Sequence, residues 1–389
     1  MITGCGVVSP LGEGVPAFWE GLLAGRSAVA PARGFAAADL APNAVAEVRG
    51  VADDDPDRAG AFALLAAAQA LAEAGLDVPS ATARWGVALG TTLGGMRLHE
   101  LWDAGRPEAL PALAAIPYYG PAVRLARRFG CRGPVATAQL ACASGTQAIA
   151  WAGRWIRDGR ADVVLAGGAD LLCRFVVAGF NCLRATADTA RPFDRRRQGL
   201  VLGEGAALVV VESRAHAEAR GARLRAVLRG AGAAADAVHM TAPDREGGGA
   251  ARAMTAALRD AGVDPTAVGL VSAHGTGTVY NDAMEAAALG RVFAEHRVPV
   301  NSIKGAIGHT LGAAGAFEAV MCVQALATGC IPPTAGLEEP DPACAAIDLV
   351  RGAARSAPVA VALSTSSGFA GANAALVLGA PSGAPMGDR

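Results

Sequence analysis

Four short runs of β-type residues in this sequence are apolar almost throughout and end in glycine or turn residues. They are residues 85–90 (WGVALG), 162–167 (DVVLAG), 206–212 (AALVVVE) and 374–379 (AALVLG). A strand with one wet face alternates apolar and polar side chains, whereas a strand buried on both faces is apolar throughout. The runs therefore predict strands covered by helices on both faces, which restricts the chain to a layered α/β architecture.

Helices able to cover such strands lie between the runs. Residues 59–74 (AGAFALLAAAQALAEA) are apolar nearly all round, which is typical of a deeply buried helix. Residues 248–261 form a second candidate, and Gly262 follows it as a helix C-cap should. A charged, helix-like stretch at 214–225 joins two halves that share no visible sequence repeat, and residues 381–389 resemble a flexible tail.

Composition argues against several classes of function. The formal net charge of −1 argues against a nucleic acid or an anionic membrane as the main partner. No unbroken apolar run reaches the ~18 residues of a spanning helix, and no basic region precedes the apolar N-terminus, so we expect neither a membrane segment nor a signal peptide. None of the eight cysteines belongs to a CxxC pair, so we expect no metal site and a reduced, cytoplasmic protein.

The basic residues are unevenly chosen, since 33 are arginine and only Lys304 is lysine. Codon bias explains an excess of arginine, but it does not explain why a lysine is retained at this position. Lys304 lies five residues before His309, at the mouth of a Gly/Ala-rich helix that could pack very close to another backbone. The alternatives are an accidental lysine and a glycine-rich loop with incidental polar residues.

Cys142 stands in the small-residue sequence ACASG, between a strand-like run at 135–140 and a helical stretch at 146–157. This position places the sulfur at a sharp turn and a helix N-terminus, where the helix dipole and free N–H groups would lower the thiol pKa. Small neighbours would let a substrate reach the sulfur. The alternative is a buried cysteine that serves only packing.

Two further loops combine an active or aromatic side chain with small neighbours. His274 ends an apolar run and begins the sequence HGTGT, and Phe369 lies between glycines in SSGFAGAN. The alternatives are a structural histidine and a tight turn before the last strand. A dinucleotide site is not supported, because no strand-GxGxxG-helix unit with an acidic partner is present. Together the loops supply a nucleophile and groups that could manage charge on a thioester, namely Cys142, His274, His309 and Lys304.

From about Ile2 to Leu378 the chain resembles the elongating Cys-His-His type of β-ketoacyl-acyl-carrier-protein synthase. The resemblance rests on ITGCGVVSPLG, ACASG, RPFD continuing to GEG, HGTGT, KGAIGHTLGAAG and the GFxG loop, which occur in this order. It implies the thiolase fold, an α/β fold with two similar βαβαβαββ halves in a five-layered α-β-α-β-α arrangement. The halves would span residues 1–221, with the cysteine, and 222–389, with both histidines and the lysine. Members of the family are usually dimers.

The resemblance also implies a reaction, a decarboxylative Claisen condensation. Cys142 would take an acyl group from an acyl carrier protein, and a malonyl-carrier thioester would then enter and lose CO2. His274 and His309 would stabilise the resulting enolate, whose carbanion attacks the acyl-Cys142 thioester. The backbone N–H groups of Cys142 and Phe369 would form the oxyanion hole, and Phe369 would gate malonyl entry.

Supporting roles follow from the same resemblance. Lys304, paired with Glu318, would orient and polarise the His309 region, and Thr276 and Thr278 would hold the phosphopantetheine arm. No cofactor beyond that arm would be needed. The partners would be an acyl carrier protein and either a second copy or a related synthase-like subunit.

Matching motif positions indicates an acyl pocket and a docking surface. The pocket candidates include two tyrosines that would reach across the dimer; they are Leu93, Phe180, Tyr118 and Tyr119. Carrier proteins are acidic, so arginines are expected at the entrance. The alternative for each is a solvated charge run, and the candidates are Arg124, Arg127, Arg128, Arg195, Arg196 and Arg197.

Several departures from the family pattern bear on the pathway. HGTGT is followed by VYND, where Pro and Gly are usual, and Ala370 replaces a gate glycine, which would stiffen the loop. Pro117 and Pro121 should break a usual helix start, and the chain is shortened mostly around residues 97–117. We therefore hypothesise a specialised polyketide, aryl or polyene acyl substrate rather than housekeeping fatty-acid elongation. Chain length, unsaturation, starter group and the choice between homodimer and heterodimer stay open.

Two other functions are less well supported. A thiolase usually needs a second catalytic cysteine late in the chain. The late cysteines Cys322, Cys330 and Cys344 fall in a helix, a strand-like end and a Pro-flanked loop rather than in a glycine-rich active-site motif. A non-catalytic chain-length partner lacks the nucleophilic cysteine, which is present here as Cys142.

Overall fold

The computed structural model describes residues 1–35, 37, 39–52, 55–76, 83–106, 116–294 and 296–381. Most of the predicted tail, residues 382–389, and part of the shortened region between residues 97 and 117 lie outside the described residues.

The first half of the chain builds a six-stranded sheet in the order β2-β1-β9-β7-β5-β6. Every residue of β1, β5, β7 and β9 is buried, and the apolar runs predicted this for β5, β7 and β9. The strands are β1 (Ile2–Ser9), β2 (Gly12–Glu13), β5 (Trp85–Gly90), β6 (Val135–Ala138), β7 (Val163–Asp170) and β9 (Gly205–Glu212).

The second half builds another six-stranded sheet, in the order β10-β17-β16-β11-β12-β14. Its long central strands, β16 and β17, form a hairpin, and β11 and β12 run parallel beside it. The strands are β10 (Val227–Ala235), β11 (Leu270–Ser272), β12 (Pro299–Asn301), β14 (Asp348–Leu349), β16 (Val361–Gly368) and β17 (Ala372–Gly379).

The two sheets repeat one topology. Numbered along each half, the five principal strands stand in the sheet order 1-5-4-2-3, so β1, β5, β6, β7 and β9 correspond to β10, β11, β12, β16 and β17. The structure therefore contains the repeat that the sequence does not show. The central strands of both sheets are buried on both faces, and many apolar residues satisfy this requirement.

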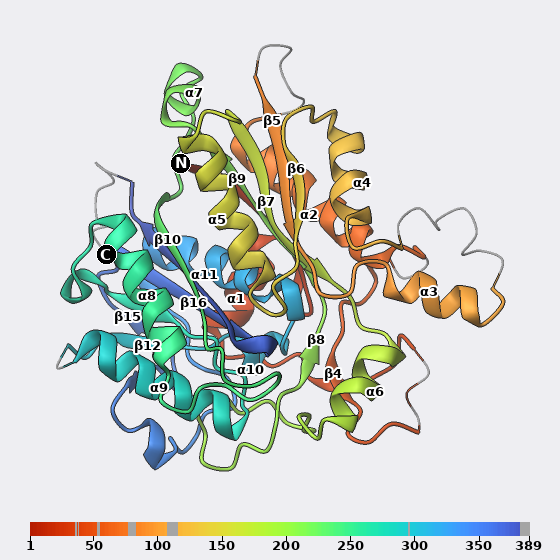
Figure 1. The fold of residues 1–389 in the computed structure, drawn as a ribbon, viewed down its shortest axis with the longest axis vertical. Helices are drawn as coiled ribbons and strands as arrows, with labels where there is room; N and C mark the ends of the chain where they lie inside the picture. Colours follow the sequence, from red (N-terminus) through yellow and green to blue (C-terminus); the bar gives the residue numbers. More distant parts are fainter. Residues whose placement is uncertain are drawn as a thin grey trace.

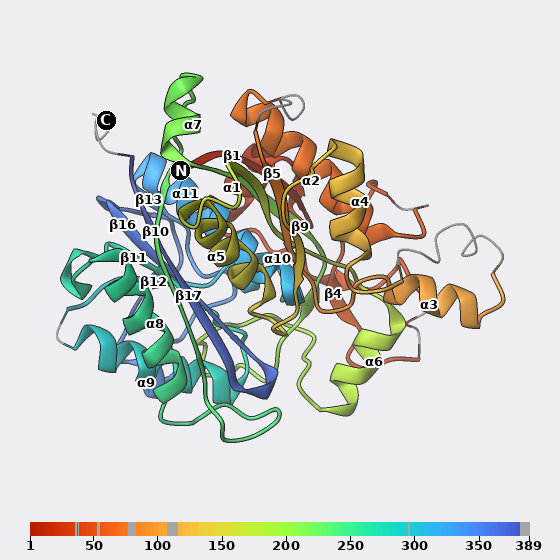
Figure 2. The same ribbon diagram turned by 45° about the horizontal axis from the view of Figure 1, so that its top comes forward.

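The sheets and helices form five layers, as predicted (Figures 1 and 2). Helices α2 (Arg58–Ala74) and α4 (Gly120–Phe129) cover the outer face of the first sheet. Helices α8 (Gly248–Ala261) and α9 (Val279–Phe293) cover the outer face of the second sheet, which is the face turned away from the first sheet. Between the sheets lie α5 (Ser144–Arg157) and α11 (Ala314–Thr328).

Shorter elements complete the chain. They are α1 (Val15–Leu23), β3 (Ala30–Pro31), β4 (Ala44–Ala46), α3 (Met96–Asp103), α6 (Arg174–Cys182), β8 (Leu202–Gly203), α7 (Arg214–Ala219), η2 (Pro265–Ala267), α10 (Lys304–Ile307), η3 (Leu311–Ala313), β13 (Cys330–Ile331), η4 (Pro342–Cys344), β15 (Arg355–Ser356) and η5 (Phe369–Gly371). Among the described residues, one helical stretch, Leu311–Thr328, is long and apolar enough to cross a membrane, and 83% of it is buried inside the protein.

Two local predictions need correction. The charged stretch 214–225 is helical only as α7, and the chain then leads into β10, so the predicted boundary between residues 221 and 222 falls between these two elements. Pro121 does not disrupt the start of α4, because it occupies the first turn of that helix. The N–H that proline lacks has no helical partner at that position, so the helix tolerates it.

The two central helices touch through their backbones at their first turns. A Cβ atom on Gly145 of α5 would lie 2.9 Å from the Gly312 carbonyl oxygen and 3.0 Å from the Ala316 nitrogen. A Cβ on Gly315 of α11 would lie 1.9 Å from Oγ1 of Thr146. Only glycine permits this approach, which confirms the predicted close packing of the Gly/Ala-rich helix and brings the starts of both helices to one place.

Candidate active site

A cavity of about 370 Å³ opens where the central helices begin, and residues from both halves line it. Cys142, His274, His309, Thr276, Thr278 and Phe369 all contribute to its wall. Lys304 lies behind the wall, buried against His274. The fold thus assembles in one site the cysteine, both histidines and the lysine that the sequence singled out.

Cys142 lies on a tight turn immediately before α5. Ala141 adopts a positive φ of 46°, and the Ser144 hydroxyl closes the turn by donating to the Ala141 carbonyl and accepting from the Leu140 N–H. Burial raises the pKa of the Cys142 thiol to about 12, and the positive charge of Lys304 only partly opposes this effect. The predicted lowering of this pKa by the helix N-terminus is therefore wrong, because loss of hydration outweighs it. The resting side chain is a thiol.

The two histidines face each other edge to face. Their ring centroids are 5.1 Å apart at an interplanar angle of 85°. Burial holds the pKa of each imidazole well below its usual range, and the nearby Lys304 charge lowers both further. Both rings are therefore neutral at pH 7, which suits them to donate hydrogen bonds to a developing oxyanion.

Lys304 makes two contacts inside the protein. Its ammonium forms an ion pair with the Glu318 carboxylate, as predicted, and lies 3.3 Å from Nδ1 of His274. Its direct histidine partner is therefore His274, whereas at His309 it acts through its charge, which lowers the pKa of that ring. Since an ammonium only donates, it assigns the accepting role to Nδ1 and leaves the His274 proton on Nε2. Among the described residues, none hydrogen-bonds to Nδ1 of His309.

Two buried carboxylates hold the site together, and the sequence analysis missed both. Glu285 accepts hydrogen bonds from the backbone N–H groups of His274 (2.6 Å) and Gly275 (2.7 Å). Asp170, at the end of β7, accepts from the N–H groups of Leu93 (2.9 Å) and Gly312 (2.7 Å). Burial raises the Asp170 pKa to about 6. The available signal was a single acid within an otherwise apolar run.

The loop with Phe369 lies next to the cysteine. A Cβ on Gly368 would come within 3.1 Å of the Cys142 nitrogen, so the two backbones nearly touch. The Phe369 ring stacks on Phe180 with centroids 5.6 Å apart. Ala370 holds a φ of 61° in the left-handed region, where glycine is favoured, and its N–H donates to the Met240 carbonyl.

The predicted acyl-pocket residues are only partly assembled in this chain. Phe180 lines the cavity, whereas Leu93 is buried in an apolar cluster against which Phe180 packs. Tyr118 and Tyr119 are 44% and 59% exposed and do not line the cavity of their own chain. Their reach across a dimer stays a prediction.

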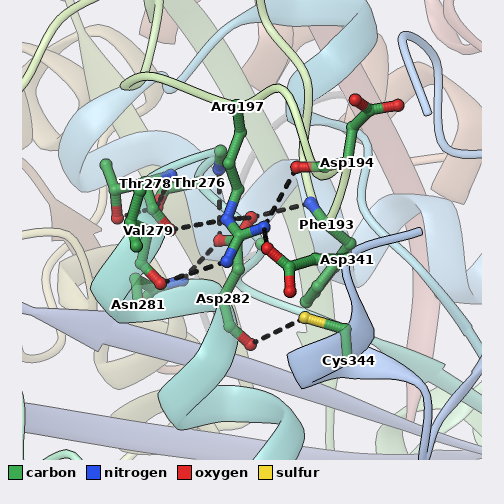
Figure 3. Close-up of polar contacts among 12 residues, drawn as sticks. Phe193, Asp194, Arg197, Thr276, Thr278, Val279, Asn281, Asp282, Asp341 and Cys344 are labelled. Atoms are coloured by element: carbon green, nitrogen blue, oxygen red, sulfur yellow. Dashed lines mark hydrogen bonds and ion pairs between the residues drawn. The ribbon is translucent and has the colours of Figure 1, made fainter. Parts of the chain in front are cut away.

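The six predicted docking arginines differ in their exposure and in their partners. The Arg197 side chain is 2% exposed and is enclosed by a polar network (Figure 3), so its assignment to a docking surface is wrong. Arg124 is bound by Asp55 and Asp57, which also contradicts a free docking role. Arg195 and Arg196 pair with acidic neighbours at the surface. Arg127 and Arg128 are exposed on α4 and stay candidates.

The described residues include no group of three or more His, Cys, Asp or Glu side chains that could hold a metal ion. Cys322 lies in α11 and Cys330 in β13, as the sequence indicated, whereas Cys344 ends the short 3-10 helix η4 rather than lying in a loop. None of these three lines the cavity that contains Cys142.

Comparisons with known proteins agree with this geometry. Residues 1–217 match the family described as "Beta-ketoacyl synthase, N-terminal domain", and residues 225–338 match the corresponding C-terminal domain. The chain is 40% identical to "Putative polyketide beta-ketoacyl synthase 1" of Streptomyces cyaneus, over 98% of each protein. It is 38% identical to "3-oxoacyl-[acyl-carrier-protein] synthase 2" of Coxiella burnetii, over 97% of each.

A solved structure extends the comparison. "The ishigamide ketosynthase/chain length factor" superposes with a TM-score of 0.90 and is 38% identical, over 98% of both chains.

Proposed function

Because the chain belongs to the β-ketoacyl synthase family, we propose that Cys142 accepts the acyl group in a decarboxylative condensation with malonyl-acyl carrier protein. The observation that carries this assignment is the shared cavity, whose wall contains Cys142 and two neutral histidines at the start of the central helices. The enzyme is thus a 3-oxoacyl-ACP synthase, an acyltransferase.

The first half-reaction transfers the acyl group to Cys142. The thiol loses its proton as sulfur attacks the acyl thioester, and that proton leaves on the departing pantetheine sulfur. A neutral imidazole in the cavity is suited to carry the proton between the two sulfurs. The N–H groups of Cys142 and Phe369, on adjoining loops, are suited to stabilise the tetrahedral oxyanion.

The second half-reaction forms the carbon–carbon bond. His274 Nε2–H and His309 donate to the malonyl thioester oxygen, and the bond to the carboxylate breaks with release of CO2. The electron pair of that bond forms the enolate, which attacks the acyl-Cys142 carbonyl. Cys142 leaves as the thiolate and takes up a proton from solvent, and the β-ketoacyl product stays on the carrier. Lys304 supports the step by fixing the His274 tautomer.

The arm of the carrier protein is the only prosthetic group this reaction needs, and Thr276 and Thr278 on the cavity wall are suited to hold it. The chain would work as a dimer. The similar structure that pairs a ketosynthase with a chain length factor supports a heterodimer over a homodimer. All eight cysteines lie among the described residues and none forms a disulfide, which supports a location in the reducing cytoplasm.

A polyketide or polyene pathway is the favoured setting. The Streptomyces relative and the ketosynthase/chain length factor structure support it, as does the gate residue Ala370. The second candidate is housekeeping fatty-acid elongation, which the Coxiella relative favours. A non-catalytic partner subunit is disfavoured because Cys142 lies in the cavity.

The test is to identify the acyl group trapped on Cys142. The protein is offered an equimolar mixture of saturated, polyunsaturated and β-ketoacyl carriers, and mass spectrometry of the Cys142 peptide reports which group is bound. Cys142→Ala is the control and should lose the acyl label. A clear preference for saturated chains would overturn the specialised pathway, and an unlabelled Cys142 would overturn the reaction itself.

A further inference from the structure

Arg197 is a buried cation at the edge of the cavity, and each of its three guanidinium nitrogens donates a hydrogen bond (Figure 3). Nη1 donates to the Asp194 carbonyl (3.0 Å) and to the Asp341 carboxylate (2.5 Å). Nε donates to the Thr278 carbonyl (3.3 Å), and Nη2 donates to the Val279 carbonyl (3.2 Å). One side chain thus links three segments that lie far apart in the sequence.

Asp282 extends this network to the middle of the HGTGT segment. Its carboxylate is fully buried, lies 3.5 Å from Nε of Arg197, and accepts the N–H groups of Phe193 (2.7 Å) and Gly277 (3.2 Å). A buried carboxylate needs a countercharge, and Arg197 supplies one here. The segment around Gly277 is therefore fixed by Arg197 both directly and through Asp282.

Both walls that the network joins line the cavity. On one side are Thr276, Thr278 and Val279, and on the other is the segment 198–200, which follows Arg197. The walls nearly touch, since a Cβ on Gly277 would lie 3.1 Å from the Gly199 carbonyl oxygen. The Thr276 and Thr278 hydroxyls are hydrogen-bonded to each other at 2.9 Å. A small shift of this segment would therefore move both hydroxyls and change the width of the cavity.

We propose that Arg197 is a positioning residue for the substrate arm. Arg197 holds the wall formed by residues 276–279 at the spacing that a phosphopantetheine chain requires. The proposal rests on the proposed function, since it takes that arm as the occupant of the cavity. Arg197 does not line the cavity and acts through Thr278, Val279 and Asp282.

The proposal predicts which kinetic constant responds. The arm lies away from the reacting carbonyl and is bound equally in the ground state and the transition state. Losing such an interaction raises KM and leaves kcat nearly unchanged. A general structural role would instead lower the amount of active enzyme, and so lower apparent kcat at constant KM.

Arg197→Lys is the informative substitution, because lysine keeps the charge but has one donor atom instead of a planar fork. Arg58→Lys is the matched control. Arg58 is likewise buried and is bound by a carboxylate, Glu204, and by backbone carbonyls, but the carbonyls that it binds belong to residues that do not line the cavity. Asp341→Asn is a milder variant that removes one partner of Arg197 and keeps the rest.

The experiment compares a reagent that has the arm with one that lacks it. Acyl transfer to Cys142 is measured with an acyl-pantetheine thioester, and alkylation of Cys142 is measured with iodoacetamide. We expect Arg197→Lys to raise KM for the thioester about tenfold with kcat within about twofold. The loss of a hydrogen bond to a charged group typically changes an equilibrium constant by about that factor. Asp341→Asn should raise KM less. Alkylation should be unchanged in both, and Arg58→Lys should keep the wild-type KM.

An unchanged KM in Arg197→Lys, or an equal rise in Arg58→Lys, would overturn the proposal. If Arg197→Lys does not fold, the KM of Asp341→Asn is measured instead, and an unchanged KM in that variant would overturn the proposal. Failure of the proposed function is recognised separately, because the wild-type protein would then transfer no acyl group to Cys142 at all.

Discussion

The Lys304 ammonium lies 3.3 Å from Nδ1 of His274 while it is paired with the Glu318 carboxylate. This contact explains why the chain retains one lysine among 34 basic residues. The side chain is 3% exposed, so the space holds a compact ammonium at the end of a flexible stem. A planar guanidinium needs more room and presents its donors in a fixed fork.

Replacing this lysine tests the relationship directly. Lys304→Arg should keep the fold and reduce condensation by roughly 100-fold, because a misplaced cation no longer holds His274 as the Nε2–H tautomer that stabilises the enolate. Steady-state turnover with malonyl-carrier substrate measures this loss, and circular dichroism checks the fold. Near wild-type turnover in Lys304→Arg would refute the assigned role.

The reactivity of Cys142 should follow the direction of its pKa. Burial raises that pKa to about 12, so the thiolate fraction, and with it the alkylation rate, should rise about tenfold per pH unit from pH 7 to 9. Peptide mass spectrometry after timed exposure to iodoacetamide separates Cys142 from the other seven cysteines. A rate that levels off below pH 8 would instead indicate a thiolate stabilised by the helix N-terminus.

Local sequence signals located the elements well. The strand at 85–90 and the helix at 248–261 have the predicted bounds, since the first is a closed apolar run and the second ends at a glycine cap. The four chemically active residues were also found, because each stands among small residues in the sequence. These features are encoded within a few neighbouring positions and need no knowledge of the rest of the chain.

What the sequence did not show is the direction in which a side chain points. Arg195 and Arg197 belong to the same basic run, yet the first is 61% exposed and the second 2%. Arg197 turns inward because Asp282 and Asp341 arrive from distant segments. Asp170 was missed for the same reason, since its partner Gly312 is 142 positions away.

The neutral histidines make stability depend on pH. Burial lowers the His309 pKa in the folded protein, so below pH 6.5 the unfolded chain binds more protons and the free energy of unfolding falls. Between pH 6.5 and 5 one such histidine costs about 2 kcal/mol. His309→Asn should therefore show a shallower loss of stability on acidification than wild type. Denaturant titrations at pH 7 and 5 measure the difference.

His99 supplies the control for that experiment, because it is exposed on α3. His99→Asn makes the same replacement at the surface, so it separates the effect of removing a buried histidine from the effect of removing any histidine. A wild-type slope in His309→Asn would show that His309 is solvated in solution and would contradict its burial in the cavity wall.

The close contact between the central helices predicts a further pair of opposite effects. Gly145→Ala adds a methyl group 2.9 Å from the Gly312 carbonyl oxygen, so α5 and α11 must separate, at a cost of about 1–3 kcal/mol. The separation moves Cys142 away from His309, and condensation should fall more than iodoacetamide alkylation of Cys142. Gly290→Ala, on α9, meets no atom within 4 Å and should stabilise the protein by about 0.5–1 kcal/mol through its helix preference. Thermal denaturation and turnover of both variants measure these effects, and equal stability of the two would contradict the helix contact.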